Sequence, residues 1–129
     1  MTSPARLAAA LRAHAQGLYC PEAAAELLIA GSWLHRADFT SQFVHVGRGL
    51  AGGQEIATID WPAAITALGA SLPCSGGEQR LLRITASLAD GIPVDLHDAL
   101  TGLDDRNVQL LITAVLHASG QSPSRRRPR

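Results

Sequence analysis

The stretch SGGEQRLLRITASLADGIPVDLHDALTGLDDRNVQLLITAVLHASG, residues 75–120, decides the fold class of this chain. Ser75 precedes Glu78 by three residues, which is the capping-box pattern, where each side chain satisfies the backbone N–H of the other residue. Asp95 and Asp104 are placed to cap two further helices. A glycine follows each predicted helix, as is common at helix C-termini, at Gly91, Gly102 and Gly120. The segment therefore predicts three consecutive helices.

Apolar residues of the last predicted helix recur at the helical period of about 3.6 residues. They are Val108, Leu111, Ile112, Val115 and Leu116. Because such a stripe usually faces the core of a domain, we expect the polar outer face of residues 75–120 to be open to a partner. That face comprises Arg80, Arg83, Asp105, Arg106, Asn107 and Gln109.

Proline lies in the first turn of three further predicted helices, at Pro4, Pro21 and Pro62. We prefer a helix for residues 38–46 as well, although a short β-hairpin near residues 43–59 is the alternative. The chain is thus predicted to be all-α or nearly all-α. We expect a small single-domain helical bundle of five to seven helices over residues 1–120, followed by a disordered basic tail over residues 121–129.

Length and charge restrict the classes of protein to consider. The 129 residues fit one domain, and the charged fraction of 17% is below the usual quarter. All eleven basic residues are arginine, and four of them stand within residues 125–129. Residues 1–120 carry seven arginines against eleven acidic residues, and an acidic body argues against a broad nucleic-acid surface.

Two motifs resemble those of nucleotide-binding enzymes, but the sequence as a whole does not predict a nucleotide site. Two segments resemble motifs of ABC-type ATPases. The signature motif is similar to residues 72–80, LPCSGGEQR, and the segment after the Walker B acid is similar to residues 100–104, LTGLD. The phosphate-binding motif GxxxxGK[ST] needs a lysine, and the chain has none. No cofactor is predicted. The five histidines lack the spacing of metal ligands, so no metal site is predicted either.

A helix–turn–helix reading of residues 95–118 is an alternative. In that case Asn107 and Gln109 would suit adenine edges, and Arg106 would suit guanine. Two aspartates at the start of the second helix would repel phosphate, and only the tail supplies nearby arginines. Nucleic-acid binding is therefore the weaker expectation, with an ordinary helical hairpin explaining the segment equally well.

A small enzyme is the second alternative. Cys74 and Ser75 are candidate nucleophiles at the start of a helix, where the helix dipole can lower the pKa of a thiol. His97 lies between two aspartates that could orient it. This hypothesis requires the three residues to meet in one pocket.

Residues 75–120 are similar to a group of small uncharacterised actinobacterial proteins. The shared pattern is SGGE, LLR, SLADG, DL-x-DAL-x-GLD-x-x-N and VLHASG, preceded by RADFTSQFVHVG at residues 36–47. The resemblance implies no activity, ligand or site residues. It agrees with the abundant alanine and the absence of lysine, which are typical of a high-GC bacterial genome.

These observations favour a non-catalytic interaction or regulatory module of a bacterial cytoplasm. No run approaches the about 20 apolar residues of a membrane span, and the first twenty residues do not form a signal peptide. The expected partner is another protein or a second copy of the chain, without a membrane. The DNA-binding regulator and the small enzyme remain the alternatives.

Overall fold

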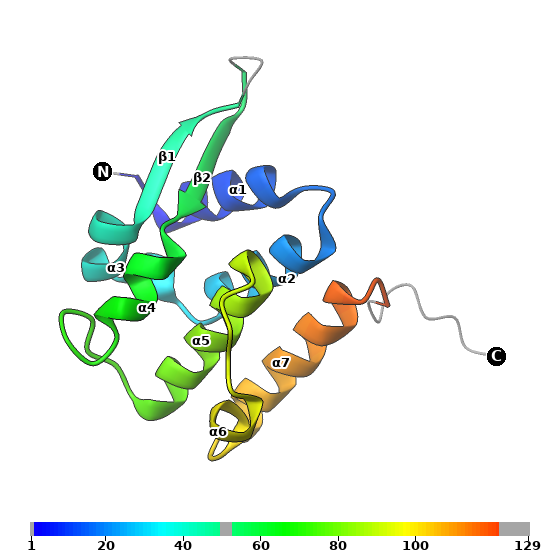
Figure 1. The fold of residues 1–129 in the computed structure, drawn as a ribbon. Coiled ribbons are helices and arrows are strands. Elements are labelled where there is room, and N and C mark those ends of the chain that lie inside the picture. The colour runs from blue at the N-terminus through cyan, green and yellow to red at the C-terminus, as the bar shows by residue number, and fades with distance from the viewer. Residues whose placement is uncertain (1, 50–52, 122–129) are drawn as a thin grey trace.

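Side-chain caps set the starts of five helices in the computed structural model, which describes residues 2–49 and 53–121 (Figure 1). The caps are Ser3, Asp60, Ser75, Asp95 and Asp104. The helices are α1 (Pro4–Ala15), α2 (Tyr19–Ala30), α3 (Ala37–Phe43), α4 (Trp61–Ala67), α5 (Gly76–Asp90), α6 (Leu96–Leu100) and α7 (Asp105–Ala118), with a 3-10 turn η1 (Trp33–His35). The predicted small, mainly helical domain is confirmed in the described residues.

The three helices predicted from residues 75–120 are present as α5, α6 and α7. The capping box is complete, because the Ser75 hydroxyl accepts from the Glu78 N–H at 3.2 Å and the Glu78 carboxylate accepts from the Ser75 N–H at 3.0 Å. At the other end of α5, Gly91 adopts φ +68°, a left-handed conformation that glycine tolerates without cost. Local sequence signals therefore set both ends of this helix.

The preferred helix for residues 38–46 is wrong beyond Phe43. There the chain leaves α3 and continues as strand β1 (Val44–Arg48), which pairs antiparallel with β2 (Glu55–Ile59). Val44 lies opposite Ile59 and Arg48 lies opposite Glu55. The physical reason is that β-branched residues on both strands favour a pleated pair, and α1 packs against β2. The alternative hairpin near residues 43–59 is the correct one.

Helix α2 is the central element of the fold. It contacts α1, α5 and α7, and Figure 1 shows it between α1 and α7 and partly hidden by α5. Its apolar residues lie on more than one face of the helix, so more than one face can pack against neighbouring elements. The residues buried on it are Ala23, Ala24, Ala25, Leu27 and Leu28.

Two apolar clusters form the core. The larger one joins α1, α2, α3, β2, α4 and α5 around the fully buried Phe39, whose ring lies 5.3 Å from that of Trp33 and 5.6 Å from that of Phe43. The smaller one joins α2, α5 and α7 through Ala23, Leu27, Leu81 and Ala114. Helix α7 is thus attached to the domain mainly through α2.

The predicted basic tail falls outside the described residues, except for Gln121. None of the helices within residues 2–49 and 53–121 combines the length and apolar character needed to cross a membrane.

Candidate functional site

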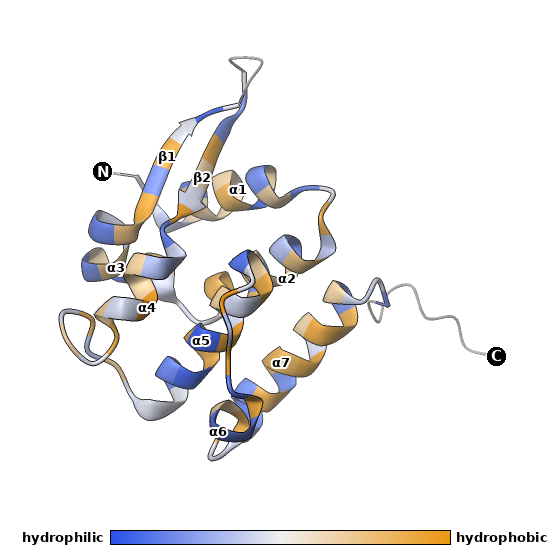
Figure 2. Cartoon of the chain, viewed as in Figure 1, coloured by the Kyte–Doolittle hydropathy of each residue, from blue (hydrophilic) through white to orange (hydrophobic). Residues whose placement is uncertain are grey.

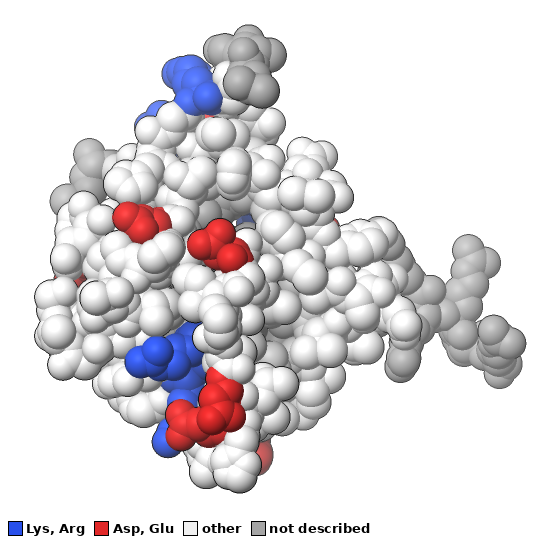
Figure 3. All heavy atoms as spheres, viewed as in Figure 1, with Lys and Arg blue, Asp and Glu red and all other residues white. Residues whose placement is uncertain are grey.

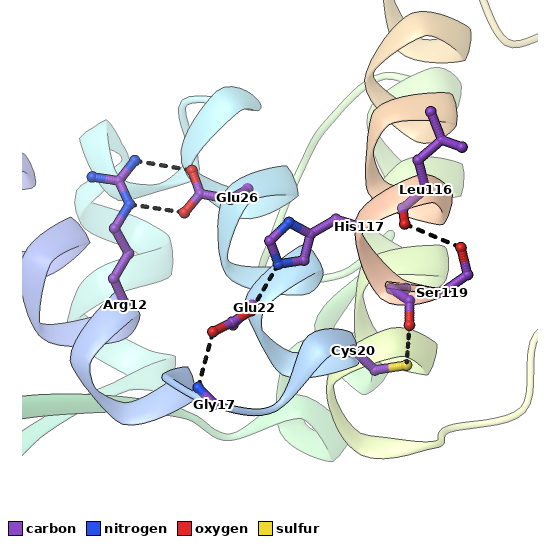
Figure 4. A network of polar contacts seen from close by, with 9 residues as sticks. Arg12, Gly17, Cys20, Glu22, Glu26, Leu116, His117 and Ser119 are labelled. Carbon is purple, nitrogen blue, oxygen red and sulfur yellow. Dashed lines mark hydrogen bonds and ion pairs between the residues drawn. The ribbon is translucent and has the colours of Figure 1, made fainter. Parts of the chain in front are cut away.

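Two polar contacts determine how α7 is turned about its own axis. Near its start, Arg106 Nη2 donates to the carbonyl oxygen of Ala30 at 2.9 Å. Near its end, His117 Nε2 lies 2.8 Å from Glu22 Oε1 (Figure 4). Because Ala30 ends α2 and Glu22 lies in its first turn, the two helices run antiparallel and are held at both ends.

Small side chains fill the space between these two contacts. Ala114 is buried on α7, and it packs in one cluster with Ala23 and Leu27 of α2. Leu110 and Ala118, one turn to either side of it, are partly buried against the same cluster. The face of α7 that meets the domain therefore contains Arg106, Leu110, Ala114, His117 and Ala118.

Three aliphatic side chains are exposed on another side of α7. Val108, Ile112 and Val115 are 36%, 46% and 53% exposed, and we call these three residues the outer stripe. Figure 2 shows how apolar residues follow the length of α7. Helix α6, joined to the start of α7 by four residues, exposes Leu96 and Leu100 to a similar degree.

The expectation that the apolar period of the last helix marks its core face is therefore wrong. Of the five residues in that pattern, Leu111 and Leu116 are partly buried and the other three form the outer stripe. The reason is tertiary. The contacts of Arg106 and His117 with α2, together with the close approach at Ala114, turn the outer stripe away from the core.

The six residues predicted to form a partner face are divided by the structure. Arg83, Asp105, Arg106 and Gln109 are exposed, and Arg106 also donates a hydrogen bond to the Ala30 carbonyl of α2. Asn107 is partly buried, and its Nδ2 atom lies 3.5 Å from the position that a Cβ on Gly77 would take. The guanidinium of Arg80 lies near the backbone of Gly76 and Gly102. Figure 3 shows basic groups over α5 next to acidic groups at α6, on a face that is otherwise largely uncharged.

A polar network joins α1, α2 and α7 beside a groove of about 530 Å³ (Figure 4). Arg12 donates two hydrogen bonds to Glu26, at 2.8 and 3.0 Å. Glu22 accepts from the Gly17 N–H at 2.9 Å and contacts His117. Because these groups form hydrogen bonds with one another, the network holds three helices together. Each charged group named here already has a partner within the protein.

A second cavity, of about 200 Å³, lies between α1, α2 and β2. Its wall is apolar at Leu11, Leu28 and Ile59, with His14 and Asp90 as polar members. Ligand pockets usually measure about 300 to 1,000 Å³. The cavity is therefore smaller than a typical site for a cofactor or metabolite.

The residues of the enzyme hypothesis lie at the start of α5 and on α6. Burial raises the pKa of the Cys74 thiol, and the Glu78 carboxylate adds to that effect, so the expected lowering of its pKa is not found. The Ser75 hydroxyl accepts the capping hydrogen bond of α5, and His97 lies exposed on α6. Among residues 2–49 and 53–121, no three His, Cys, Asp or Glu side chains gather as metal ligands would.

Comparison with protein-family models, with curated proteins and with solved structures finds no match to this chain.

Proposed function

We propose that this protein is a non-catalytic interaction module that docks another protein surface through the outer stripe of α7, in the bacterial cytoplasm that its composition predicts. The observation that carries the proposal is the exposure of Val108, Ile112 and Val115 on one face of a helix whose other face is held to α2 by polar contacts. Single exposed apolar residues are ordinary, whereas apolar side chains that gather on one surface are a feature of interaction sites.

The neighbouring surface supports this proposal. Leu96 and Leu100 on α6 are 54% and 48% exposed, and they lie one helical turn apart. These two leucines add exposed apolar area on α6, which is joined to the start of α7 by four residues.

The same geometry gives less support to DNA binding. A recognition helix presents polar side chains to base edges, whereas the exposed surface of α7 includes the three aliphatic side chains of the outer stripe, and Arg106 hydrogen-bonds to the Ala30 carbonyl of α2. Four aspartates lie on or before α6 and α7, at Asp95, Asp98, Asp104 and Asp105. These carboxylates would repel the DNA phosphates on either side of the groove that a recognition helix enters.

The test is affinity capture from the source cells with the full chain and two variants of α7. In Ile112→Arg the outer stripe carries a charge, whereas Ser41→Arg adds the same charge at an exposed position of α3. We expect capture of a discrete protein, this chain included, to be lost in Ile112→Arg and kept in Ser41→Arg.

Equal capture by both variants would contradict the proposal. So would specific DNA retention at about 150 mM salt, where non-specific binding is weak, if Arg106→Ala or Asn107→Ala abolished it. That result would favour the DNA-binding regulator.

A further inference from the structure

We infer that the outer edge of β1 and the groove beside it form a docking site for an extended segment of another protein, which adds a third strand to the hairpin. The site shares no residue with the outer stripe of α7. It follows from the register of the two strands, from the composition of β1 and from the position of the groove.

The register of the hairpin determines which backbone groups of β1 point away from β2. The Asp60 N–H donates to the Phe43 carbonyl oxygen at 2.9 Å, which makes these two residues a hydrogen-bonded pair. Such pairs recur at every second residue of an antiparallel ladder, so the N–H and C=O groups of Val46 and Arg48 point outward. Among residues 2–49 and 53–121, no group donates to or accepts from these outward groups.

The composition of β1 leaves this edge open. Proteins usually protect an edge strand with lysine, proline, a β-bulge or a covering helix. Strand β1 reads VHVGR, without lysine or proline, and its five residues pair with β2 in continuous register. In Figure 1 the hairpin extends beyond the helices, with β2 on the side of α1 and β1 on the opposite side. An extended chain can therefore reach β1 and bond to its outward groups, as in strand addition.

An apolar groove of about 380 Å³ adjoins this edge. Val44 and Val46 form its wall on β1, and its described lining includes no residue of β2, so the groove lies on the side of β1 that an added strand occupies. Its other walls come from the start of α1, from η1 and from α3, and they include Leu7 and Leu34. The volume is within the range of about 300 to 1,000 Å³ in which proteins bury ligand groups.

The edge and the groove together define the chemistry of the occupant. Outward backbone groups two residues apart on β1 are separated by about 7 Å, a spacing that the N–H and C=O groups of an extended chain match. Val44 and Val46 lie on one face of β1 because they are two residues apart, so alternate side chains of an added strand enter the groove. The occupant is therefore an extended peptide segment with aliphatic residues at alternate positions.

A second copy of this chain fits the site less well. Antiparallel pairing of β1 with itself about Val46 would place Arg48 of one copy opposite Val44 of the other, with both side chains on the same face. The guanidinium would then lie beside the apolar wall of the groove, and burying a charge there without a partner is unfavourable. A segment of a different protein can carry an aliphatic residue at that position.

The first test selects peptides about nine residues long, the length of an ordinary strand, from a displayed random library on the immobilised full chain. We expect enrichment of peptides with aliphatic residues at positions i and i+2. The binding of one enriched peptide to two variants is then measured by fluorescence polarisation.

Ser41→Arg places a charge at the wall of the groove on α3 and should weaken binding of the peptide at least about 10-fold. Ile112→Arg, on α7, is the matched control and should leave the dissociation constant within a few-fold. Both positions are exposed, so circular dichroism should show that both variants remain folded.

The second test replaces one backbone N–H of the enriched peptide at a time by N–CH₃. An added strand directs every second residue's backbone groups to β1, so methylation should weaken binding strongly at alternate positions and little at those between them. Equal effects at all positions, or effects at the three- to four-residue spacing of a helix face, would overturn strand addition.

The outcomes also distinguish this site from the outer stripe. If no peptide is enriched, or if Ser41→Arg weakens none of the enriched peptides, the β1 site is wrong. A dimer of the full chain in sedimentation equilibrium that the peptide dissociates would make a second copy the occupant and overturn the segment proposed here. The partner of the outer stripe should be lost in Ile112→Arg and kept in Ser41→Arg, which is the reverse of the result expected for the peptide.

Discussion

At the scale of single residues, short-range hydrogen bonds define the ends of the helices. Ser75 and Glu78 exchange hydrogen bonds across three residues, and Asp104 accepts from the Asn107 N–H at 2.8 Å over the same separation. Each such bond satisfies a backbone donor that has no partner within the helix. The caps contribute to stability through residues that are adjacent in the chain, with no help from the core.

Ser75→Ala should lower the free energy of unfolding by about 1 kcal/mol, because the Glu78 N–H loses its acceptor. Urea denaturation followed by circular dichroism measures the change. Ser71→Ala, at an exposed position in the connector before α5, is the control and should change stability by less than about 0.5 kcal/mol. Equal effects of the two substitutions would mean that the capping box contributes nothing.

The ion pair at the start of α3 makes stability depend on pH. Arg36 donates hydrogen bonds to both carboxylate oxygens of Asp38, at 3.0 and 2.6 Å, and these bonds hold the pKa of Asp38 below its ordinary value of 3.8. A carboxyl with a lowered folded-state pKa stabilises the fold above the unfolded-state pKa. That contribution is lost as the pH falls through the folded-state value.

Asp38→Asn should therefore lower stability at neutral pH and reduce its further loss below about pH 4. The Asp38 side chain is 37% exposed, so solvent limits the contribution to about 1 kcal/mol or less. Urea denaturation at neutral and acidic pH compares the variant with the wild type, and Asp90→Asn at another exposed aspartate serves as the control. An unchanged pH dependence in Asp38→Asn would exclude this pair as a cause of acid sensitivity.

At the scale of secondary-structure elements, the orientation of α7 determines which side chains are available for binding. The helix has two possible inner faces, one centred on Ala114 and the other on the aliphatic outer stripe. Arg106 and His117 contact opposite ends of α2, and the small Ala114 allows a close approach between them. The chain thereby buries the smaller side chain and exposes the larger ones.

Ala114→Leu should destabilise the protein by about 1 to 3 kcal/mol, because the larger side chain overfills the contact between α2 and α7. Val115→Leu, at the next position of the same helix, adds one methylene on the exposed face and should change stability by less than about 0.5 kcal/mol. Thermal denaturation of both variants at equal, low protein concentration provides the comparison. If Val115→Leu destabilised the protein more than Ala114→Leu, Val115 would lie on the inner face and the orientation of α7 described above would be wrong.

At the scale of the whole molecule, the domain has a large core with α7 attached beside it. Phe39 lies in the larger cluster between Trp33 and Phe43, and α2 links that cluster to the smaller one at α7. The larger cluster therefore supports folding, while α7 adds a surface to a domain that is already packed.

Phe39→Ala should cost about 3 to 5 kcal/mol, because it removes a fully buried ring and leaves a cavity. Val46→Ala is the large-to-small control on the exposed side of β1 and should cost less than about 0.5 kcal/mol. Urea denaturation followed by tryptophan fluorescence reports on both, since Trp33 is in the same cluster. A small effect of Phe39→Ala would mean that the core does not depend on this aromatic group.

The sequence by itself determined the features that depend on near neighbours. The starts and ends of α5, α6 and α7 follow from caps three residues apart and from glycines such as Gly91. The expectation of five to seven helices and of a possible hairpin rests on such signals together with prolines in the first turn of helices and local apolar patterns. These interactions are encoded within one or two helical turns, so they can be predicted without knowing the tertiary structure.

Only the tertiary structure decided the features that depend on distant contacts. Residues 44–46 form a strand because they pair with β2, and α7 exposes its outer stripe because Arg106 and His117 contact α2 at separations of 76 and 95 residues. Periodicity shows that a helix has an apolar face, but it does not show which face of the helix packs against the rest of the domain. The outer stripe thus became visible as a candidate binding surface only when the orientation of α7 was known.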